Sequence, residues 1–284
     1  METEIEILPG YQEFWPVAFA TFEAFFEAAR KTEPLINEIF SVGRAEPLHK
    51  VLRHLSKIVS NSFSALLILG INGFGNDAMK LARGMFEISL TVAYLKQHPE
   101  EFDDYMDYHW IVAMKRHRYV LKHAPDLLKQ IHAEPVEEIV ANYQRVAPKF
   151  TDSRGRVRGR WSRKSFAQIA EELGMADHYE TFYRFASGMH HGDVSGMMMQ
   201  VESGNGVLDV NVAPSLEWVR EAFISGHAAL VLAVSAYVDC CLSEKKSLAE
   251  ELETSFIRAW EEIGPAREKS YIERKTADST PAEN

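Results

Sequence analysis

The sequence predicts an all-α protein, a mainly helical bundle with one small β-hairpin near residues 197–212. Over most of the 284 residues, apolar side chains recur at spacings of three and four, which is the period of an amphipathic helix. One short stretch instead alternates apolar and polar residues around the turn sequence SGNG at 203–206, a pattern typical of a hairpin. Hydrophobic residues make up 46% of the chain, which is enough for a buried core. We expect a main helical domain at 48–264, an N-terminal helical segment at 1–47 that packs on it, and a disordered tail at 265–284.

Prolines bound the first expected helix. Apolar and aromatic residues recur at helical spacing over residues 11–31, so this stretch is predicted to be a helix that begins or is interrupted near Pro16. Pro34 lies beyond its expected end, because proline cannot continue a helix without the loss of a backbone hydrogen bond.

Glycines interrupt the next helical segment, which begins near Pro47 and ends before Pro99. That length exceeds one ordinary helix. Glycine costs about 1 kcal/mol relative to alanine inside a helix. The three glycines Gly70, Gly73 and Gly75 therefore either break the segment into two helices or mark a close crossing of another helix.

The middle of the chain continues the helical pattern and then changes character. Residues 100–123 and 135–146 are predicted to form two further helices. The strongest run of charge follows at 149–165, where six basic residues occur between Arg154 and Lys164. Glycines within this run indicate a loop.

A capping box marks the helix that follows the loop. Ser165 is a typical N-cap residue with Gln168 three positions later, and Gly174 is placed to end the helix. The remaining helices are expected at 177–191, 222–242 and 248–263.

Composition excludes several classes of function. The formal net charge of -10 argues against a general affinity for nucleic acid or anionic membranes, because such binding needs clustered positive charge. The N-terminus, METEIEILPGYQEF, has neither the basic start nor the apolar run of a secretory signal peptide. Cys240 and Cys241 are adjacent, so an ordinary disulfide between them is geometrically unfavourable, and two thiols do not by themselves make a zinc site. We predict a cytoplasmic protein with no cofactor and no bound metal.

One stretch tests this expectation, because residues 222–242 are long and apolar enough to be considered as a membrane span. His227 and Asp239 would both be costly in lipid. A helix that is apolar all round lies either in a protein core or in a membrane, and these two residues favour the core. We therefore expect a buried central helix and no membrane.

Polar side chains gather on one face of the helix expected at 177–191. At about 100° per residue, five of them fall within about a third of the circumference. They are Tyr183, Arg184, Ser187, His190 and His191. The opposite side carries the apolar residues Phe182, Phe185, Ala186 and Met189. Because this apolar face is enough to bury the helix, the polar stripe is a candidate functional site.

A second polar stripe lies in the helical segment before Pro99. Arg83 and Glu87 are four residues apart on one face and can form an ion pair. In an otherwise apolar helix these charges must be paired or hydrogen-bonded, and the stripe on residues 177–191 could supply partners. The two stripes form either a functional pocket or a structural polar network that fixes the register of the helices.

These residues resemble those of a known family. The pattern Arg83xxxGlu87, then Trp161, the FAQIAEELG helix, and Tyr183xxxSer187xxxHis191 is similar to that of an uncharacterised bacterial all-helical family, a domain of unknown function. The resemblance covers about residues 48–195. It implies a fold and the location of a site, and no established reaction.

A second resemblance implies chemistry. Arg184 is followed by His190 after five residues and by His191 after six, which resembles the RxxxxH type of motif of the helical HEPN superfamily. The resemblance implies a metal-independent ribonuclease that acts as a homodimer. Histidine can transfer the proton of an RNA 2'-hydroxyl, and arginine can stabilise charge on the phosphoryl group. Candidate RNA contacts in the basic loop are Arg156, Arg158, Arg160, Trp161 and Arg163.

The prediction therefore assigns catalysis to three residues and leaves two alternatives. The catalytic residues are Arg184, His190 and His191, and the supporting or binding residues are Arg83, Glu87, Tyr183, Ser187 and Asp193. The main alternative is a non-enzymatic helical module that binds a small-molecule ligand or a partner chain between the stripes. The other is a divalent-metal-dependent hydrolase with the ligands His190, His191, Asp193 and Glu87.

Overall fold

The computed structural model describes the backbone of residues 11–127, 135–191, 194, 201–204, 207–210 and 216–278. Within these ranges, side chains are described except at 11–14, 127, 201–210 and 264–278. The chain divides into two compact units. The first comprises Met1–Lys96 and Ala170–Asn284, and the second comprises Gln97–Ile169.

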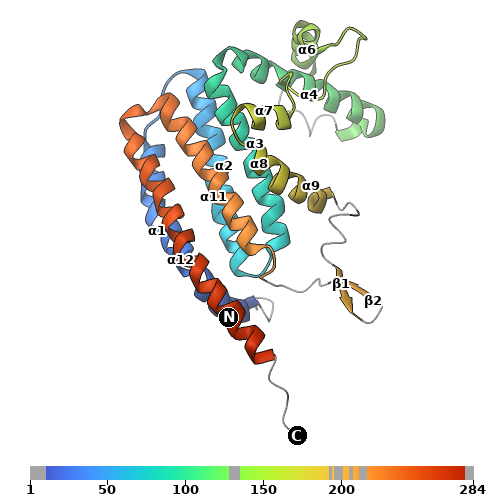
Figure 1. Ribbon diagram of the computed structural model, residues 1–284. Coiled ribbons are helices and arrows are strands. Elements are labelled where there is room, and N and C mark those ends of the chain that lie inside the picture. Colours follow the sequence, from blue (N-terminus) through green and yellow to red (C-terminus); the bar gives the residue numbers. More distant parts are fainter. Residues whose placement is uncertain are drawn as a thin grey trace, which may run out of the picture. The chain divides into compact units, whose positions relative to one another are not determined.

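Long helices form the first unit, which confirms the prediction of an all-α protein. They are α1 (Tyr11–Ser41), α2 (Pro47–Ile71), α3 (Gly75–Gln97), α11 (Val219–Cys241) and α12 (Lys246–Asp278). In Figure 1, α1 runs beside α12 and α2 runs beside α11, although each pair is far apart in the sequence. Helix α12 continues past residue 265, where the sequence predicts that a disordered tail begins.

The first helix is longer than predicted. Helix α1 continues through Pro34 to Ser41, so the expected end at residue 31 is wrong. The irregular backbone inside it lies at Phe22 (φ -122°, ψ 23°), not at Pro16. Ile39 is fully buried beyond Pro34, and this burial offsets the backbone hydrogen bond that proline removes.

Both expectations for the glycines between Pro47 and Pro99 are confirmed. The segment is broken into two helices, α2 and α3, and α2 crosses α11 closely. Gly73, at φ 78°, lies in the turn between α2 and α3, a conformation that glycine adopts without steric cost. At Gly70, a Cβ would lie 2.3 Å from the ring of Phe223 on α11. The small residue therefore allows α2 and α11 to approach each other closely.

Helix α11 is the centre of the first unit. Hydroxyl groups tie two neighbouring helices to it: Ser56 donates to the carbonyl of Ala233 (3.1 Å), and Ser89 donates to that of Ala229 (2.7 Å). More than half of the most apolar 18-residue stretch of α11 is buried in the fold. In the described part of the chain, α2 and α11 are each long and apolar enough to cross a membrane, a test that core helices also pass.

The helix predicted at 177–191 is three consecutive helical pieces. They are α8 (Ala176–His178), the π-helix η3 (Tyr179–Tyr183) and α9 (Arg184–His191). The wider π turn changes the angular phase between the residues before and after it. The apolar face is confirmed, since Phe182, Ala186 and Met189 are buried.

Two short strands follow this region. Strand β1 (Val201–Gly204) pairs antiparallel with β2 (Val207–Val210), with Val201 opposite Val210. The residues that join these strands, and those on either side of them, lie outside the described residues. The 3-10 helix η4 (Ser243–Lys245) links α11 to α12.

The second unit is built on a helical hairpin. Its helices are α4 (Phe102–His123) and α6 (Val136–Phe150), with the short 3-10 helices η1 (Pro99–Glu101) and η2 (Pro125–Leu127). Ile111, Val146 and Phe150 form a buried cluster between the two helices. The loop after α6 contains a β-bridge between Thr151 and Val157, and the Arg158 amide donates to the Phe150 carbonyl (2.9 Å).

The predicted capping box begins α7 (Phe166–Glu172). The amide of Ser165 donates to the Gln168 side chain (2.8 Å), and the amide of Gln168 donates to the Ser165 hydroxyl (3.3 Å). Gly174 has φ 71°, as expected for a residue that ends a helix in the left-handed conformation.

Candidate functional site

The structure joins the two polar stripes through Tyr183. Its hydroxyl donates to Oε1 of Glu87 (2.6 Å) and accepts a hydrogen bond from Nη2 of Arg83 (3.2 Å). Arg83 and Glu87 form the predicted ion pair at 2.8 Å. The Arg83 guanidinium also lies over the Tyr183 ring, 5.1 Å from its centroid. The two residues of α3 and the tyrosine of η3 thus form one connected network, in which Nε of Arg83 is buried without a hydrogen-bond partner in the described structure.

Burial makes this network strong. Tyr183 is only 8% exposed, and the Arg83 and Glu87 side chains are 15% and 28% exposed. Burial, together with the Glu87 carboxylate, raises the pKa of Tyr183 to about 12. The tyrosine is therefore protonated at neutral pH and serves as a hydrogen-bond donor. Because Glu87 already accepts from Tyr183 and pairs with Arg83, its carboxylate is engaged within the network.

The three residues predicted to be catalytic lie at the surface of α9. Arg184 is exposed and pairs with Glu180 one turn earlier (2.9 Å). His190 and His191 are also exposed, with their ring centroids 5.0 Å apart. Ser187 is half-buried on the same helix, and Asp193 lies outside the described residues. The geometry thus separates the buried Tyr183 from the exposed end of its stripe.

The basic loop belongs to the second unit, where two of its residues are part of the packing. The Arg158 side chain is 19% exposed, pairs with Asp104 (3.4 Å) and lies over the Phe150 ring. Trp161 packs edge-on against Tyr105, with centroids 5.2 Å apart. The other three predicted RNA contacts, Arg156, Arg160 and Arg163, are exposed. Arg156 pairs with Asp152 at 3.1 Å.

A pocket in the first unit lies beside the polar network. Its volume is about 360 Å³, and we call it the His178–Trp218 pocket. It is lined by Met79, His178, Thr181, Phe182, Phe185, Trp218, Glu221, Ile224 and Ser225, which come from α3, the α8–η3–α9 segment and α11 with its N-cap. The π-helix contributes Thr181 and Phe182. Such turns occur frequently at functional sites.

Two side chains of this pocket carry buried nitrogens without a hydrogen-bond partner in the described structure, Nε2 of His178 and Nε1 of Trp218. The His178 ring packs between Phe86 and Phe182, with centroids 4.7 and 5.0 Å away. Burial lowers the pKa of His178 to about 4, so the imidazole is neutral at neutral pH. A neutral imidazole offers one donor and one acceptor nitrogen.

The backbone at Trp218 is strained. It has φ 63°, a left-handed conformation that is an outlier for a bulky residue. The preceding residue touches α3: a Cβ on Gly75 would lie 1.8 Å from the carbonyl oxygen of Glu217. A tilted contact with the Phe185 ring, with centroids 4.7 Å apart, holds the indole on the pocket wall. Strained residues of this kind gather at ligand-binding sites.

Sequence reasoning did not identify His178 or Trp218. His178 has the appearance of an ordinary polar residue near a helix start, and Trp218 follows a segment without helical period. The burial of their ring nitrogens depends on contacts with Phe86 of α3 and Phe185 of α9, which no local pattern encodes. No local signal in the sequence distinguishes either residue as part of a site.

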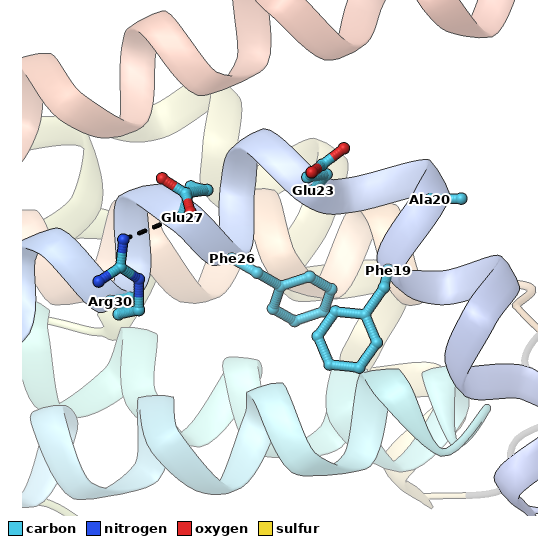
Figure 2. A pocket seen from close by; sticks show the side chains of 6 residues that line it. All are labelled: Phe19, Ala20, Glu23, Phe26, Glu27 and Arg30. Carbon is cyan, nitrogen blue, oxygen red and sulfur yellow. Dashed lines mark hydrogen bonds and ion pairs between the residues drawn. The ribbon is translucent and has the colours of Figure 1, made fainter.

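A second hollow, of about 420 Å³, lies along α1. Figure 2 shows Phe19 and Phe26 side by side in it, with centroids 4.9 Å apart, and the ion pair of Glu27 with Arg30 farther along the helix. Its charged side chains are largely exposed, and Phe19 is 45% exposed. The hollow therefore lacks the buried polar groups that distinguish the His178–Trp218 pocket.

Comparison with known proteins assigns the chain to a family. No curated protein and no solved structure matches the chain. Residues 49–207 match a family described as "Family of unknown function (DUF5677)". The match contains α3, with Arg83 and Glu87, and the helical segment with Tyr183. Because it covers more than half of the chain, this protein belongs to the DUF5677 family of unknown function.

Proposed function

We propose that this protein binds a small, mainly apolar molecule with one hydroxyl-like group in the His178–Trp218 pocket. The observation that carries the proposal is the combination of an aromatic wall with two buried, unpartnered nitrogens. Buried polar groups normally have hydrogen-bond partners, so such nitrogens indicate a missing partner. A hydroxyl can accept from the Trp218 N–H and donate to the acceptor nitrogen of His178.

The charge of the lining favours a neutral ligand. Among the nine lining residues that the structure describes, Glu221 is the one ionisable carboxylate, and none is lysine or arginine. An anionic ligand such as a phosphate would find no positive partner there. The volume of about 360 Å³ falls at the lower end of the range for small-molecule sites.

A matched pair of probes tests the proposal. Calorimetric titration of the purified protein with 1-naphthol and with naphthalene compares two ligands of similar shape that differ by one hydroxyl. We expect one naphthol to bind per chain, at least about fivefold more tightly than naphthalene, since one hydrogen bond contributes about 1 kcal/mol and a tenfold difference requires about 1.4 kcal/mol. In His178→Phe this preference is expected to decrease, because the imidazole partner is gone and only the Trp218 N–H is left to bind the hydroxyl.

Two further variants define the location. Ile224→Trp fills the pocket and is expected to abolish binding of both probes. His227→Phe is the matched control, since His227 is a half-buried histidine outside the pocket lining that accepts from Trp260 (2.9 Å). Each variant is compared with wild type by circular dichroism. Absence of binding to wild type, or unchanged binding by Ile224→Trp, would refute the proposal.

A second candidate function is metal-independent cleavage of RNA, proposed from the HEPN resemblance. The exposure of Arg184, His190 and His191 favours it, because a polymer substrate can reach them. The test is cleavage of end-labelled RNA with and without EDTA, beside a folded Arg184→Ala/His190→Ala/His191→Ala variant. EDTA-resistant cleavage that the variant lacks supports this function. Equal amounts of cleavage by wild type and the variant argue against it. A homodimer and a cytoplasmic location stay predictions.

A further inference from the structure

Two cysteines and a histidine meet where α2 begins and α11 ends. His49 lies in the first turn of α2, and Cys240 and Cys241 are the last two residues of α11. One imidazole nitrogen and the two sulfur atoms lie within 4.8 Å of one another. Neither cysteine forms a disulfide. The sequence separates His49 from the cysteines by almost two hundred positions, so only the packing of α2 on α11 creates this cluster.

The surrounding structure holds the end of α11 in place. Arg44 donates from Nε to the carbonyl oxygen of Cys241 (2.9 Å) and from Nη2 to Glu244 (2.5 Å). Cys241 is 7% exposed, whereas Cys240 and His49 are half-buried. The cluster is therefore positioned by its neighbours and still reachable from solvent.

A carboxylate stands beside the imidazole. Oε2 of Glu46, the N-cap residue of α2, lies 3.4 Å from Nε2 of His49. Metal-bound histidines usually have a carboxylate or carbonyl next to the ring, which orients the imidazole. Glu46 is placed to act in this way.

We propose that His49, Cys240 and Cys241 bind one zinc ion, with a fourth position open to water. Two thiolates and an imidazole are a donor set that zinc prefers. Zinc–sulfur bonds of about 2.3 Å place tetrahedral sulfur ligands about 3.8 Å apart, so the side chains need to close by only about 1 Å. When zinc binds, the two thiols lose their protons to solvent. This site is separate from the His178–Trp218 pocket and does not depend on the function proposed for it.

Cobalt(II) provides a direct test, because it occupies tetrahedral thiolate sites and reports them by absorption. The full chain is reduced, stripped with EDTA, freed of chelator and titrated with cobalt chloride. We expect a sulfur-to-cobalt charge-transfer band that saturates at one ion per chain and disappears when zinc chloride displaces the cobalt. Cys240→Ser and His49→Ala are each expected to weaken binding by about tenfold or more.

His54→Ala is the matched control, because His54 is an exposed histidine on the same helix, outside the cluster. It should leave the band and the stoichiometry unchanged, and circular dichroism compares the fold of all variants. The proposal is overturned if wild type shows no charge-transfer band at saturating cobalt. It is also overturned if Cys240→Ser gives the same titration curve as wild type.

Discussion

The hydroxyl of Tyr183 forms hydrogen bonds to both other members of the polar network, so its removal is the sharpest test of that network. Tyr183→Phe deletes one oxygen and leaves the ring in place. The oxygen lies 2.6 Å from Oε1 of Glu87 and 3.2 Å from Nη2 of Arg83, and both bonds involve a charged partner. The Arg83–Glu87 ion pair, at 2.8 Å, stays intact in the variant and limits the damage.

The structure sets the expected magnitude. A hydrogen bond to a charged group contributes about 1.5–3 kcal/mol to stability. Because the Arg83–Glu87 ion pair remains, we expect the loss of one such contribution and not two.

The raised pKa also predicts how this contribution depends on pH. Between pH 10 and 12 the native state keeps the Tyr183 proton while the unfolded state loses it. The unfolding free energy that Tyr183 contributes is therefore complete below pH 10 and declines as the pH rises toward 12. Tyr183→Phe should be about 2–3 kcal/mol less stable than wild type near neutrality, and this difference should shrink in alkali.

Urea unfolding at a series of pH values measures the difference, with an unchanged m-value as evidence that the same surface is exposed. Tyr179→Phe is the matched control, since the Tyr179 ring stacks on Tyr183 with centroids 4.7 Å apart and the change removes the same atom one turn earlier. It should cost less than about 0.5 kcal/mol. The reasoning is refuted if Tyr183→Phe costs no more than this control, or if its cost is the same at every pH.

Three further predictions concern the backbone, the pocket and the exposed stripe. In Gly75→Ala the new Cβ would lie 1.8 Å from a carbonyl oxygen, so this variant should be less stable than wild type by about 1–3 kcal/mol. Gly84 has open space around it, so Gly84→Ala should be more stable by up to about 1 kcal/mol. A higher unfolding temperature for Gly75→Ala than for Gly84→Ala would contradict this prediction. Because burial lowers the pKa of His178 to about 4, the stability that the neutral imidazole contributes is present above pH 6.5 and is lost as the pH falls toward 4. In His178→Phe the unfolding free energy should therefore fall by about 3 kcal/mol less between pH 6.5 and 4 than in wild type. The same fall in both proteins would contradict the assignment of a buried, neutral imidazole. Arg184→Ala breaks an exposed pair with Glu180 and should change the unfolding free energy by less than about 1 kcal/mol, so a larger loss in urea would show a structural role for the arginine.

Much of the fold is predictable because local signals encode it. Helical period, the capping box of Ser165 with Gln168, and the left-handed Gly174 each depend on residues within a few positions of one another. The same holds for the pair of Arg83 with Glu87, which the spacing of four places on one helix face. The error at Pro34 has the opposite origin: burial of residues beyond the proline overrides a local signal that normally ends a helix.

The candidate site was predictable only in part. The sequence by itself determined which side chains share a helix face, and it brought Tyr183 into consideration with Arg83 and Glu87. Only the tertiary structure decided that Tyr183 is buried while Arg184 is exposed, because packing against α3 selects one edge of the stripe.

Tertiary structure alone also created the His178–Trp218 pocket and the cluster of His49 with the two cysteines. Their members come from segments that are distant in the sequence. Gly70 lets α2 approach α11, and Gly75 lets the backbone of Glu217, next to Trp218, lie against α3. A period of 3.6 residues describes one helix at a time. It contains no information on which turn of one helix lies against which turn of another, and that register is set by the sum of side-chain volumes across the core.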